Sequence, residues 1–189
     1  MRKLLLILSL LVATTLSAQD KKYHGDGPDD VLQYVPFASV FALKALGVES
    51  ESSWKRMGIN VGASYVLSAG VAWVLKHTVK EERPDGTDDR AFPSGHSTIA
   101  FAGAHALHKE YGHLSPWISV AGYTVATFTA VDRVARNRQH WYDAVAGAAI
   151  GILGTEAAYW LCDKITGWNE KGNYRVGVSP GGISLAIGL

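Results

Sequence analysis

The chain has 189 residues, with 18 Lys and Arg against 17 Asp and Glu and a formal net charge of +1 at pH 7. This length suits one domain with a full hydrophobic core and is short for two. The near-neutral charge and the lack of a basic stripe interleaved with aromatic residues argue against nucleic-acid binding. The single cysteine, Cys162, excludes an intrachain disulfide and a cysteine-based metal site, and its apolar surroundings indicate a small core residue.

Residues 1–18 have the pattern of an export signal. Met1-Arg2-Lys3 is a basic start, residues 4–16 are apolar, and Ala18 is a small residue before a polar one. Cleavage after Ala18 is one expectation. Leu16 fits poorly at the position two before that cut, so an uncleaved signal anchor is the alternative. Either pattern predicts an exported protein of the cell envelope.

A polar, Gly/Asp/Pro-rich lead-in over residues 19–30 precedes the expected helical domain, residues 31–165. Its apolar stretches are rich in Ala, Gly, Val and Leu and lack the strict alternation of strands, so we predict helices. With the N-terminal run, they predict an all-α bundle of five to six apolar helices. The expected helices of the domain are Val31–Leu46, Gly58–Leu75, Ser97–Leu107, Pro116–Val131 and Asp143–Leu161.

Two of these stretches approach the roughly 20 apolar residues that a membrane span needs, Gly58–Leu75 and Asp143–Leu161. With the N-terminus inside, Lys55, Arg56 and Lys109 fall in cytoplasmic connectors, as the positive-inside rule prefers. The polar clusters described below then face the exterior. We therefore expect membrane association, with a soluble periplasmic domain as the alternative because the mean hydropathy is only +0.06.

The tail, residues 166–189, differs in character from the domain before it. Tyr174, Val176 and Val178 alternate with other residues, Pro180-Gly181 is a turn signal, and residues 183–189 are apolar again. This pattern predicts a short β-hairpin.

Three polar clusters interrupt the apolar stretches. The first is Lys76, at the end of one stretch, with Arg83-Pro84 seven residues later. A phosphate dianion needs positive charge and several donors, and Arg supplies a planar fork that matches two phosphate oxygens. Pro84 disfavours helix at Arg83 and so leaves the guanidinium on a turning segment. The alternative interpretation is a snorkelling Lys and a surface Arg beside a helix end.

The second cluster is Pro93-Ser94-Gly95-His96, directly before an apolar stretch. Ser94 is well suited to cap a helix that begins there, and the free N–H groups of a helix start favour an anion. Gly95 lets a backbone N–H approach a phosphate oxygen without a Cβ in the way. His96 can donate a proton to a leaving alcohol oxygen. The alternative is a plain capped helix with an exposed histidine.

The third cluster contains Arg133, which follows one apolar stretch, and His140 and Asp143, which open the last one. An imidazole held by a carboxylate can act as a nucleophile toward phosphorus, because the carboxylate fixes its tautomer and stabilises the developing charge. Arg133 would add positive charge against the transition-state oxygens. The alternative is a basic connector with a locally satisfied His140.

Taken together, the clusters make the chain similar to a known family over residues 58–157. It resembles the type 2 phosphatidic acid phosphatase superfamily, which also contains bacterial acid phosphatases and vanadium haloperoxidases. The Lys, six residues, Arg-Pro pattern and the Pro-Ser-Gly-His pattern are both matched in full. The resemblance implies a helical bundle that hydrolyses a phosphomonoester or diphosphate without a metal or other cofactor. Its third-motif histidine would form a phosphohistidine, and its second-motif histidine would protonate the leaving group.

One position departs from that family. Its third motif reads Ser-Arg, five residues, His, three residues, Asp, so Arg133 and Asp143 are spaced as required, but Asp132 replaces the Ser and Gln139 stands at the nucleophile position. His140 is one residue later, which is a rotation of about 100° in a helix. We expect a local loop to bring His140 into place as the nucleophile.

Our hypothesis is an enzyme of the cell envelope that releases phosphate from a small-molecule or, given its proximity to the membrane, a lipid-linked substrate. Lys76, Arg83 and Arg133 clamp the phosphate, Ser94 and Gly95 supply cap and oxyanion donors, and no metal takes part. Two alternatives are a vanadate-dependent haloperoxidase and an inactive phosphate- or lipid-binding relative that lost its nucleophile at Gln139. Two further groups of residues have side chains that could bind a metal, but we do not interpret either as a metal site. His105, His108 and His113 lie on or near one helix, remote from the three clusters. Asp85, Asp88 and Asp89 are interpreted as part of a solvated loop.

Overall fold

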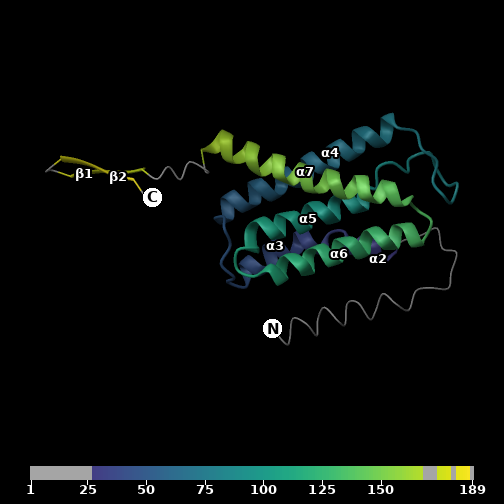
Figure 1. Ribbon diagram of the computed structural model, residues 1–189, viewed down its shortest axis with the longest axis horizontal. Helices are drawn as coiled ribbons and strands as arrows, with labels where there is room; N and C mark the ends of the chain where they lie inside the picture. Colours follow the sequence, from purple (N-terminus) through teal and green to yellow (C-terminus); the bar gives the residue numbers. More distant parts are fainter. Residues whose placement is uncertain (1–26, 168–173, 180–181, 188–189) are drawn as a thin grey trace.

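The computed structural model describes residues 27–167, 174–179 and 182–187, so the predicted export signal lies outside the described residues. The described chain forms six α-helices followed by a two-stranded hairpin (Figure 1). This confirms the all-α prediction for the domain. The elements are α2 (Pro28–Leu32), α3 (Val35–Ala45), α4 (Trp54–Thr78), α5 (Gly95–Tyr111), α6 (Pro116–Ala135), α7 (Trp141–Thr166), β1 (Tyr174–Ser179) and β2 (Gly182–Ile187).

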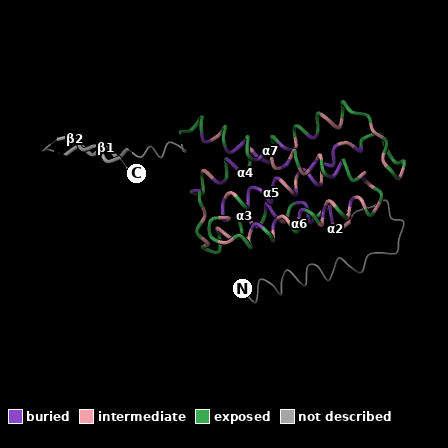
Figure 2. The backbone as a smooth tube through the Cα atoms, viewed as in Figure 1, coloured by how far each residue is buried: buried purple, intermediate pink, exposed green. Residues whose placement is uncertain are grey.

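Helix α5 lies at the centre of the bundle and packs against α3, α4, α6 and α7. Its small side chains permit this, since Ala100, Ala102, Ala104 and Ala106 are all fully buried. Figure 2 shows the buried positions concentrated along α5, with exposed positions on the outer faces of the surrounding helices. These small residues let the surrounding helices approach α5 closely.

Most helices are longer than their apolar stretches, and serine caps set the starts of three of them. The side chains of Ser53, Ser94 and Ser115 each accept a hydrogen bond from a backbone N–H in the first turn of α4, α5 and α6. The predicted helix over residues 31–46 is instead two helices. Pro36 lies in the first turn of α3, where it lacks an N–H and disfavours helix in the residue before it, so α2 ends and α3 begins just upstream.

The alternating direction of the helices gathers the three polar clusters at one end of the bundle. Helices α4 and α6 end there, and α5 and α7 begin there, with the connections 79–94 and 136–140 between them (Figure 1). The two connections are joined by an ion pair of 2.8 Å between Arg138 and Asp85. Asp85 also accepts hydrogen bonds from the backbone and hydroxyl of Thr87. The segment predicted as a solvated loop is thus held by Asp85, whose carboxylate is largely buried.

The opposite end carries the larger hydrophobic cluster, in which α3, α4, α5 and α7 meet around Tyr111 and Met57, both completely buried. The Tyr111 hydroxyl donates to the carbonyl of Val40 at 2.7 Å. Glu110 is also fully buried, and it accepts hydrogen bonds from the Tyr159 hydroxyl and the Ser52 N–H. This end anchors the helices whose other ends carry the polar clusters.

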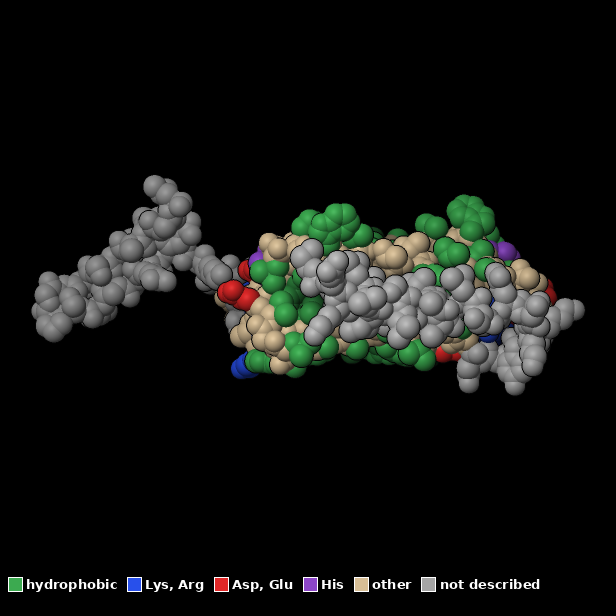
Figure 3. Space-filling view, turned by 90° about the horizontal axis from the view of Figure 1, so that it is seen from below, with side chains coloured by type: hydrophobic (Ala, Val, Ile, Leu, Met, Phe, Trp, Pro, Cys, Tyr) green, Lys and Arg blue, Asp and Glu red, His purple; other side chains and the backbone are tan. Residues whose placement is uncertain are grey.

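Two helices, α4 and α7, have the length and apolar composition of a membrane span. Large apolar side chains point outward on both, including Val66, Trp73, Leu153 and Trp160, each more than 59% exposed. On the face seen in Figure 3, charged side chains gather toward the two ends of the helical body and hydrophobic side chains lie between them. By itself this pattern is weak support for a membrane location.

The predicted C-terminal hairpin is present. Strands β1 and β2 pair antiparallel, with Tyr174 opposite Ile187 and Ser179 opposite Gly182. The predicted turn signal at Pro180-Gly181 lies outside the described residues.

Candidate active site

Hydrogen bonds to main-chain carbonyls join the three clusters to one another. The Lys76 ammonium donates to the Pro93 carbonyl at 2.8 Å, which ties the first cluster to the second. The Ser94 N–H donates to the Asp143 carbonyl at 3.0 Å, which ties the second to the third. Arg83 closes the ring with a 2.9 Å bond from Nη1 to the Arg138 carbonyl. The predicted convergence of the clusters is therefore a feature of the fold.

The two cations of the first cluster are held in different ways. Lys76, in the last turn of α4, also donates to the Arg90 carbonyl at 2.7 Å, so it braces the turn before α5. Arg83 lies in the connection after α4, and its Nε donates to the Asp88 carboxylate at 2.7 Å. Burial would raise the pKa of Asp88, but the hydrogen bonds from Arg83 and the Arg90 N–H together with the charges of Arg83 and Lys76 outweigh burial and lower the pKa. Carbonyl oxygens therefore orient Lys76, and a carboxylate and a carbonyl oxygen orient Arg83.

Ser94 caps α5 as predicted, accepting from the Ser97 N–H at 3.3 Å. Its own N–H is taken by the Asp143 carbonyl, and its side chain is fully buried. The prediction of Ser94 as an oxyanion donor therefore needs correction: it fixes the helix start, and the open donor position moves to Gly95. A Cβ built on Gly95 would meet nothing within 4 Å, so open space adjoins the backbone at this position.

His96 lies in the first turn of α5 and is held by α2. Its Nε2 is 2.7 Å from Asp30 Oδ1 and 3.6 Å from Asp29 Oδ2. Burial lowers the pKa of His96 and the charge of Arg133 lowers it further, whereas the two carboxylates act in the opposite direction. Burial would raise the pKa of Asp30, but hydrogen bonds from His96 and the Gly27 N–H outweigh it and the pKa falls below its usual value.

Those two shifts favour different protonation states of the pair. A low pKa at Asp30 favours an ion pair, whereas a low pKa at His96 favours a neutral ring. The contact is compatible with both states, because an Nε2–H can donate to the carboxylate whether or not the ring is charged.

Arg133, in the last turn of α6, is 94% buried and would be costly to bury alone. Its Nη1 donates to Asp29 Oδ2 at 2.8 Å, and Arg136 binds the other oxygen of the same carboxylate. The Arg133 Nε is also buried, and no hydrogen-bond partner for it lies within the described part of the chain. That nitrogen is a donor available to an anionic ligand.

His140 caps the N-terminus of α7, and its Nδ1 is 3.2 Å from Asp143 Oδ2. The same oxygen accepts the His140 backbone N–H at 2.8 Å, so one carboxylate fixes both main chain and ring. The ring stacks on Tyr142 with centroids 4.9 Å apart, and Glu81 Oε1 lies 3.5 Å from Nδ1. Asp143 is fully buried and its Oδ1 has no partner among the described residues.

Gln139 is only 2% exposed, and its buried Oε1 has no hydrogen-bond partner within the described ranges. His140 lies in the extended conformation of a helix cap, with φ −74° and ψ 159°. The predicted local loop before Asp143 is therefore present, since α7 begins only at Trp141. In this geometry the ring that meets Asp143 belongs to His140.

The chain is similar to known proteins in both sequence and fold. The model of the PAP2 superfamily matches residues 85–166, which contain the second and third clusters. Over these residues the chain is similar to the PAP2 superfamily. Lipid A 1-phosphatase from Porphyromonas gingivalis is 43% identical over 149 residues, 76% of this chain. The chain spans 33% of the length of that relative.

The crystal structure of LpxE from Aquifex aeolicus has the same fold. It superposes with a TM-score of 0.54 over 69% of this chain and 82% of its own, with 20% sequence identity. At that identity the likeness concerns the fold alone.

Three acidic residues at this site were missed in the sequence. Asp29 and Asp30 fall in the predicted polar lead-in, yet they lie in α2 and contact Arg133 and His96. Glu81 lies in the first connection and reaches both His140 and the Tyr142 hydroxyl. Only one signal was available for α2: Gly, Pro and two acids in a row, which is typical of a helix start.

The same carboxylates form two groups that could hold a cation. They are Asp29 with Asp30 and His96, and Glu81 with His140 and Asp143, each with ligand atoms within 4.8 Å of one another. Three ligand atoms at such distances fit a divalent ion as well as they fit an internal hydrogen-bond network. The metal-free chemistry expected of PAP2 proteins is therefore a matter for experiment, and a chelator belongs in the first assay.

Proposed function

We propose that this chain is the catalytic domain of a phosphatase that removes phosphate from a lipid through a phosphohistidine, without a metal. The observation that carries the proposal is the convergence of the His140–Asp143 pair, Arg133 and His96 at one end of the bundle. A nucleophile, a cation and a proton donor are the parts that phosphoryl transfer requires.

In the proposed reaction His140 attacks phosphorus through Nε2. Its Nδ1 faces Asp143, whose carboxylate holds the ring and stabilises the positive charge that develops as the N–P bond forms. The bond from phosphorus to the leaving oxygen breaks, and that oxygen takes a proton from His96. Water then attacks the phosphohistidine, His96 accepts its proton, and phosphate leaves.

The phosphate would be bound by donors that the fold already orients. Arg83 is fixed by Asp88 and the Arg138 carbonyl, and Arg133 keeps a buried Nε without an internal partner among the described residues. The Gly95 N–H adds a neutral donor at a helix start, where the dipole favours an anion. Lys76 contributes mainly by bracing the Arg90–Pro93 turn and by its long-range charge.

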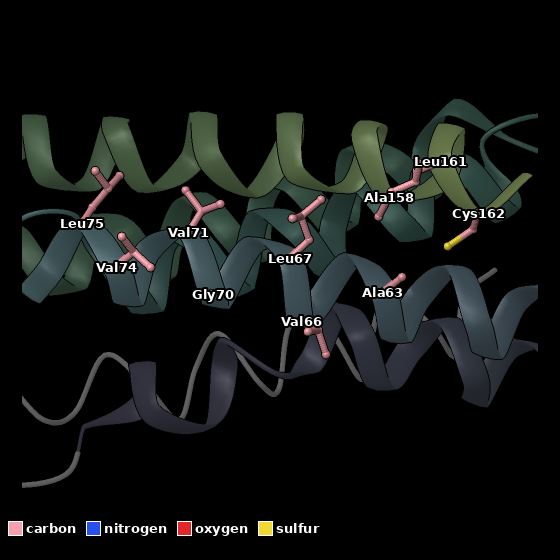
Figure 4. A pocket seen from close by; sticks show the side chains of 10 residues that line it. All are labelled: Ala63, Val66, Leu67, Gly70, Val71, Val74, Leu75, Ala158, Leu161 and Cys162. Atoms are coloured by element: carbon pink, nitrogen blue, oxygen red, sulfur yellow. The ribbon is translucent and has the colours of Figure 1, made fainter. Parts of the chain in front are cut away.

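A lipid substrate is supported by the apolar exterior and by a groove beside the site. The groove, about 570 Å³ in volume, runs between α4 and α7, and its lining is almost wholly apolar (Figure 4). Leu75 lines one end and directly precedes Lys76, so the groove reaches the end of the bundle that holds the site. The relative from Porphyromonas gingivalis makes lipid A the first substrate to test, and we infer an active site on the external face of the membrane.

The test is phosphate release in EDTA from lipid A, phosphatidic acid and an aryl phosphate, by wild type, His140→Ala and Arg83→Ala. We expect EDTA-resistant turnover by wild type and loss of it in His140→Ala. A matched exposed histidine, His113→Ala at the opposite end, should keep full activity. Turnover that EDTA abolishes and a divalent ion restores would contradict the metal-free reaction.

A second candidate, an inactive phosphate-binding relative, is favoured by one observation: Gln139 is the buried residue at the family's nucleophile position. It predicts that wild type binds phosphate or vanadate without turnover in any of these assays, and that Gln139→His creates activity. Under the main proposal, by contrast, His140 supplies the ring and Gln139→His gives no gain. The variants His140→Ala and Gln139→His therefore distinguish the two candidate functions.

A further inference from the structure

Helix α2 places two carboxylates inside the site. It is short, with Pro28 in its first turn and Asp29 and Asp30 following, and the Asp30 side chain accepts the Gly27 N–H at 2.8 Å. The Arg136 guanidinium packs over Gly27, where a Cβ would lie 1.6 Å from Arg136 Nη1. The helix therefore docks closely against the C-terminal end of α6.

The two carboxylates have different partners. Asp29 is completely buried and is neutralised by Arg133 and Arg136. Its role therefore cannot be separated from that of Arg133, which belongs to the proposed phosphate clamp. Asp30 is partly exposed and makes its one ion pair with His96. Breaking a buried pair such as that of Asp29 leaves an uncompensated charge and endangers the fold. Asp30 is consequently the residue at which function can be tested separately from folding.

The environment of His96 explains why it needs a carboxylate. The ring is largely buried and faces Arg133 on α6, both of which oppose a positive charge, while Asp29 and Asp30 on α2 favour it. A general acid must carry its proton at the working pH. Without Asp30, burial and Arg133 would leave the imidazole neutral over more of the pH range.

We propose that Asp30 is a positioning residue for the general acid: it binds Nε2 of His96, favours the protonated form of the ring, and leaves Nδ1 to donate to the leaving-group oxygen. This inference rests on the proposed phosphatase function. Asp30 forms no bond with the substrate. The proton moves from Nδ1 to the departing oxygen as its bond to phosphorus breaks, and the Asp30 carboxylate stays ionised before and after the step.

The role can be separated from mere folding by the choice of leaving group. Phosphatidic acid expels a strongly basic alkoxide and needs the acid, whereas p-nitrophenyl phosphate expels a weakly basic phenolate and needs it little. We expect Asp30→Asn to lower kcat/KM for phosphatidic acid by roughly 10-fold to 100-fold, part of the roughly 10²–10⁴-fold effect of a general acid. For p-nitrophenyl phosphate the loss should be less than about threefold, a bound set by the small role of the acid.

The pH profile gives a second, independent readout. Activity requires protonated His96, so the basic limb of kcat/KM reports its pKa in the free enzyme. Removing the charge of Asp30 lowers that pKa, and the basic limb should move to lower pH by about one unit, the smaller end of the effect of a nearby charge. Asp30→Glu, which retains the carboxylate, should restore most of the rate and the limb, and Asp89→Asn on the exposed loop should change neither.

The double variant His96→Ala with Asp30→Asn completes the experiment. If Asp30 acts through His96, the double variant should be no slower than His96→Ala alone. If wild type is active and Asp30→Asn has the same kcat/KM as wild type for both substrates, this inference is overturned but the proposed phosphatase function is retained. A faster Asp30→Asn would also overturn it and identify α2 as an inhibitory plug. A wild type that turns over neither substrate would overturn the phosphatase and this inference with it.

Thermal unfolding of each variant in detergent tests whether a loss of activity is caused by unfolding. If Asp30→Asn melts well below wild type, the ratio of the two substrates still decides, because partial unfolding lowers both rates equally. An equal loss with both substrates would count against the positioning role.

Discussion

Gly147 of α7 lies directly against the main chain of Ser94 at the start of α5. A Cβ built on Gly147 would come within 2.4 Å of the Ser94 carbonyl oxygen, and within 3.1 Å of the Ser97 Cβ. This contact brings the helix of the proposed nucleophile against the helix of the proposed acid. It also supports the bond from the Ser94 N–H to the Asp143 carbonyl one turn earlier on α7.

We therefore expect Gly147→Ala to separate the two helix starts. The substitution should cost about 1–3 kcal/mol of unfolding free energy through overpacking, partly offset by the better helix propensity of Ala. Activity should fall with it, because the acid and nucleophile move apart.

The control is Gly62→Ala on α4, where a Cβ would meet nothing within 4 Å. At this position no steric clash opposes the gain in helix propensity of about 1 kcal/mol from Gly to Ala, so the variant should be at least as stable as wild type. Thermal unfolding of both variants in detergent, with phosphate release, makes the comparison. Equal stability of the two variants would contradict the steric argument.

Much of the fold could be predicted because the information is local. Apolar stretches without strand alternation indicated the helices, and Ser94 before an apolar run indicated the start of α5. The gathering of the clusters on one side followed from the alternating direction of the apolar stretches across a membrane. The break between α2 and α3 was missed, since residues 31–46 are mostly apolar and only Pro36 marks the break.

The acidic partners could not be predicted because they depend on contacts between distant segments. Asp29 and Arg133 are 104 residues apart, and His96 and Asp30 are 66 apart. The helix-start signal in this Gly/Asp/Pro-rich segment does not tell whether the helix docks against α6. The shift from Gln139 to His140 was visible in the sequence, but its resolution needed the extended backbone at the start of α7.

The assignment of the nucleophile predicts opposite results at two adjacent positions. His140→Ala should lower phosphatase activity by roughly 10³-fold or more, as loss of a nucleophile does in other covalent enzymes. Gln139→Ala should retain activity within about tenfold, because its side chain supplies no reacting atom and its effect is limited to packing. Trapping of a phosphorylated histidine from labelled substrate provides the direct readout. Equal losses at both positions would contradict the assignment.

Arg83 should be intolerant even of lysine. Its Nε and Nη1 bind two different partners, Asp88 and the Arg138 carbonyl, which the single ammonium of a lysine cannot reproduce. Charged hydrogen bonds are worth about 1.5–3 kcal/mol, so Arg83→Lys should lower kcat/KM by roughly 10-fold to 100-fold. The exposed Arg90→Lys serves as the control and should match wild type. Recovery of full activity in Arg83→Lys would show that charge alone suffices.

The last prediction concerns Asp132, which occupies the position of the family's serine. Burial raises the pKa of Asp132 to about 6, and the neighbouring Asp29 carboxylate contributes. The folded state therefore holds this proton more tightly than the unfolded chain, whose value is near 3.8. The contribution of Asp132 to stability is complete below pH 4 and is lost as the pH rises toward 6.

Asp85 provides the opposite case within the same protein. Burial would raise the pKa of Asp85, but hydrogen bonds from Thr87 and Arg138 outweigh it and bring the pKa to about 2. Its contribution is therefore present above pH 4 and lost as the pH falls toward 2. Thermal unfolding in detergent from pH 3 to pH 7 should show that Asp132→Asn flattens the profile between pH 4 and 6, whereas Asp85→Asn alters only the acidic end. An unchanged slope between pH 4 and 6 in Asp132→Asn would contradict the assignment of the buried proton to Asp132.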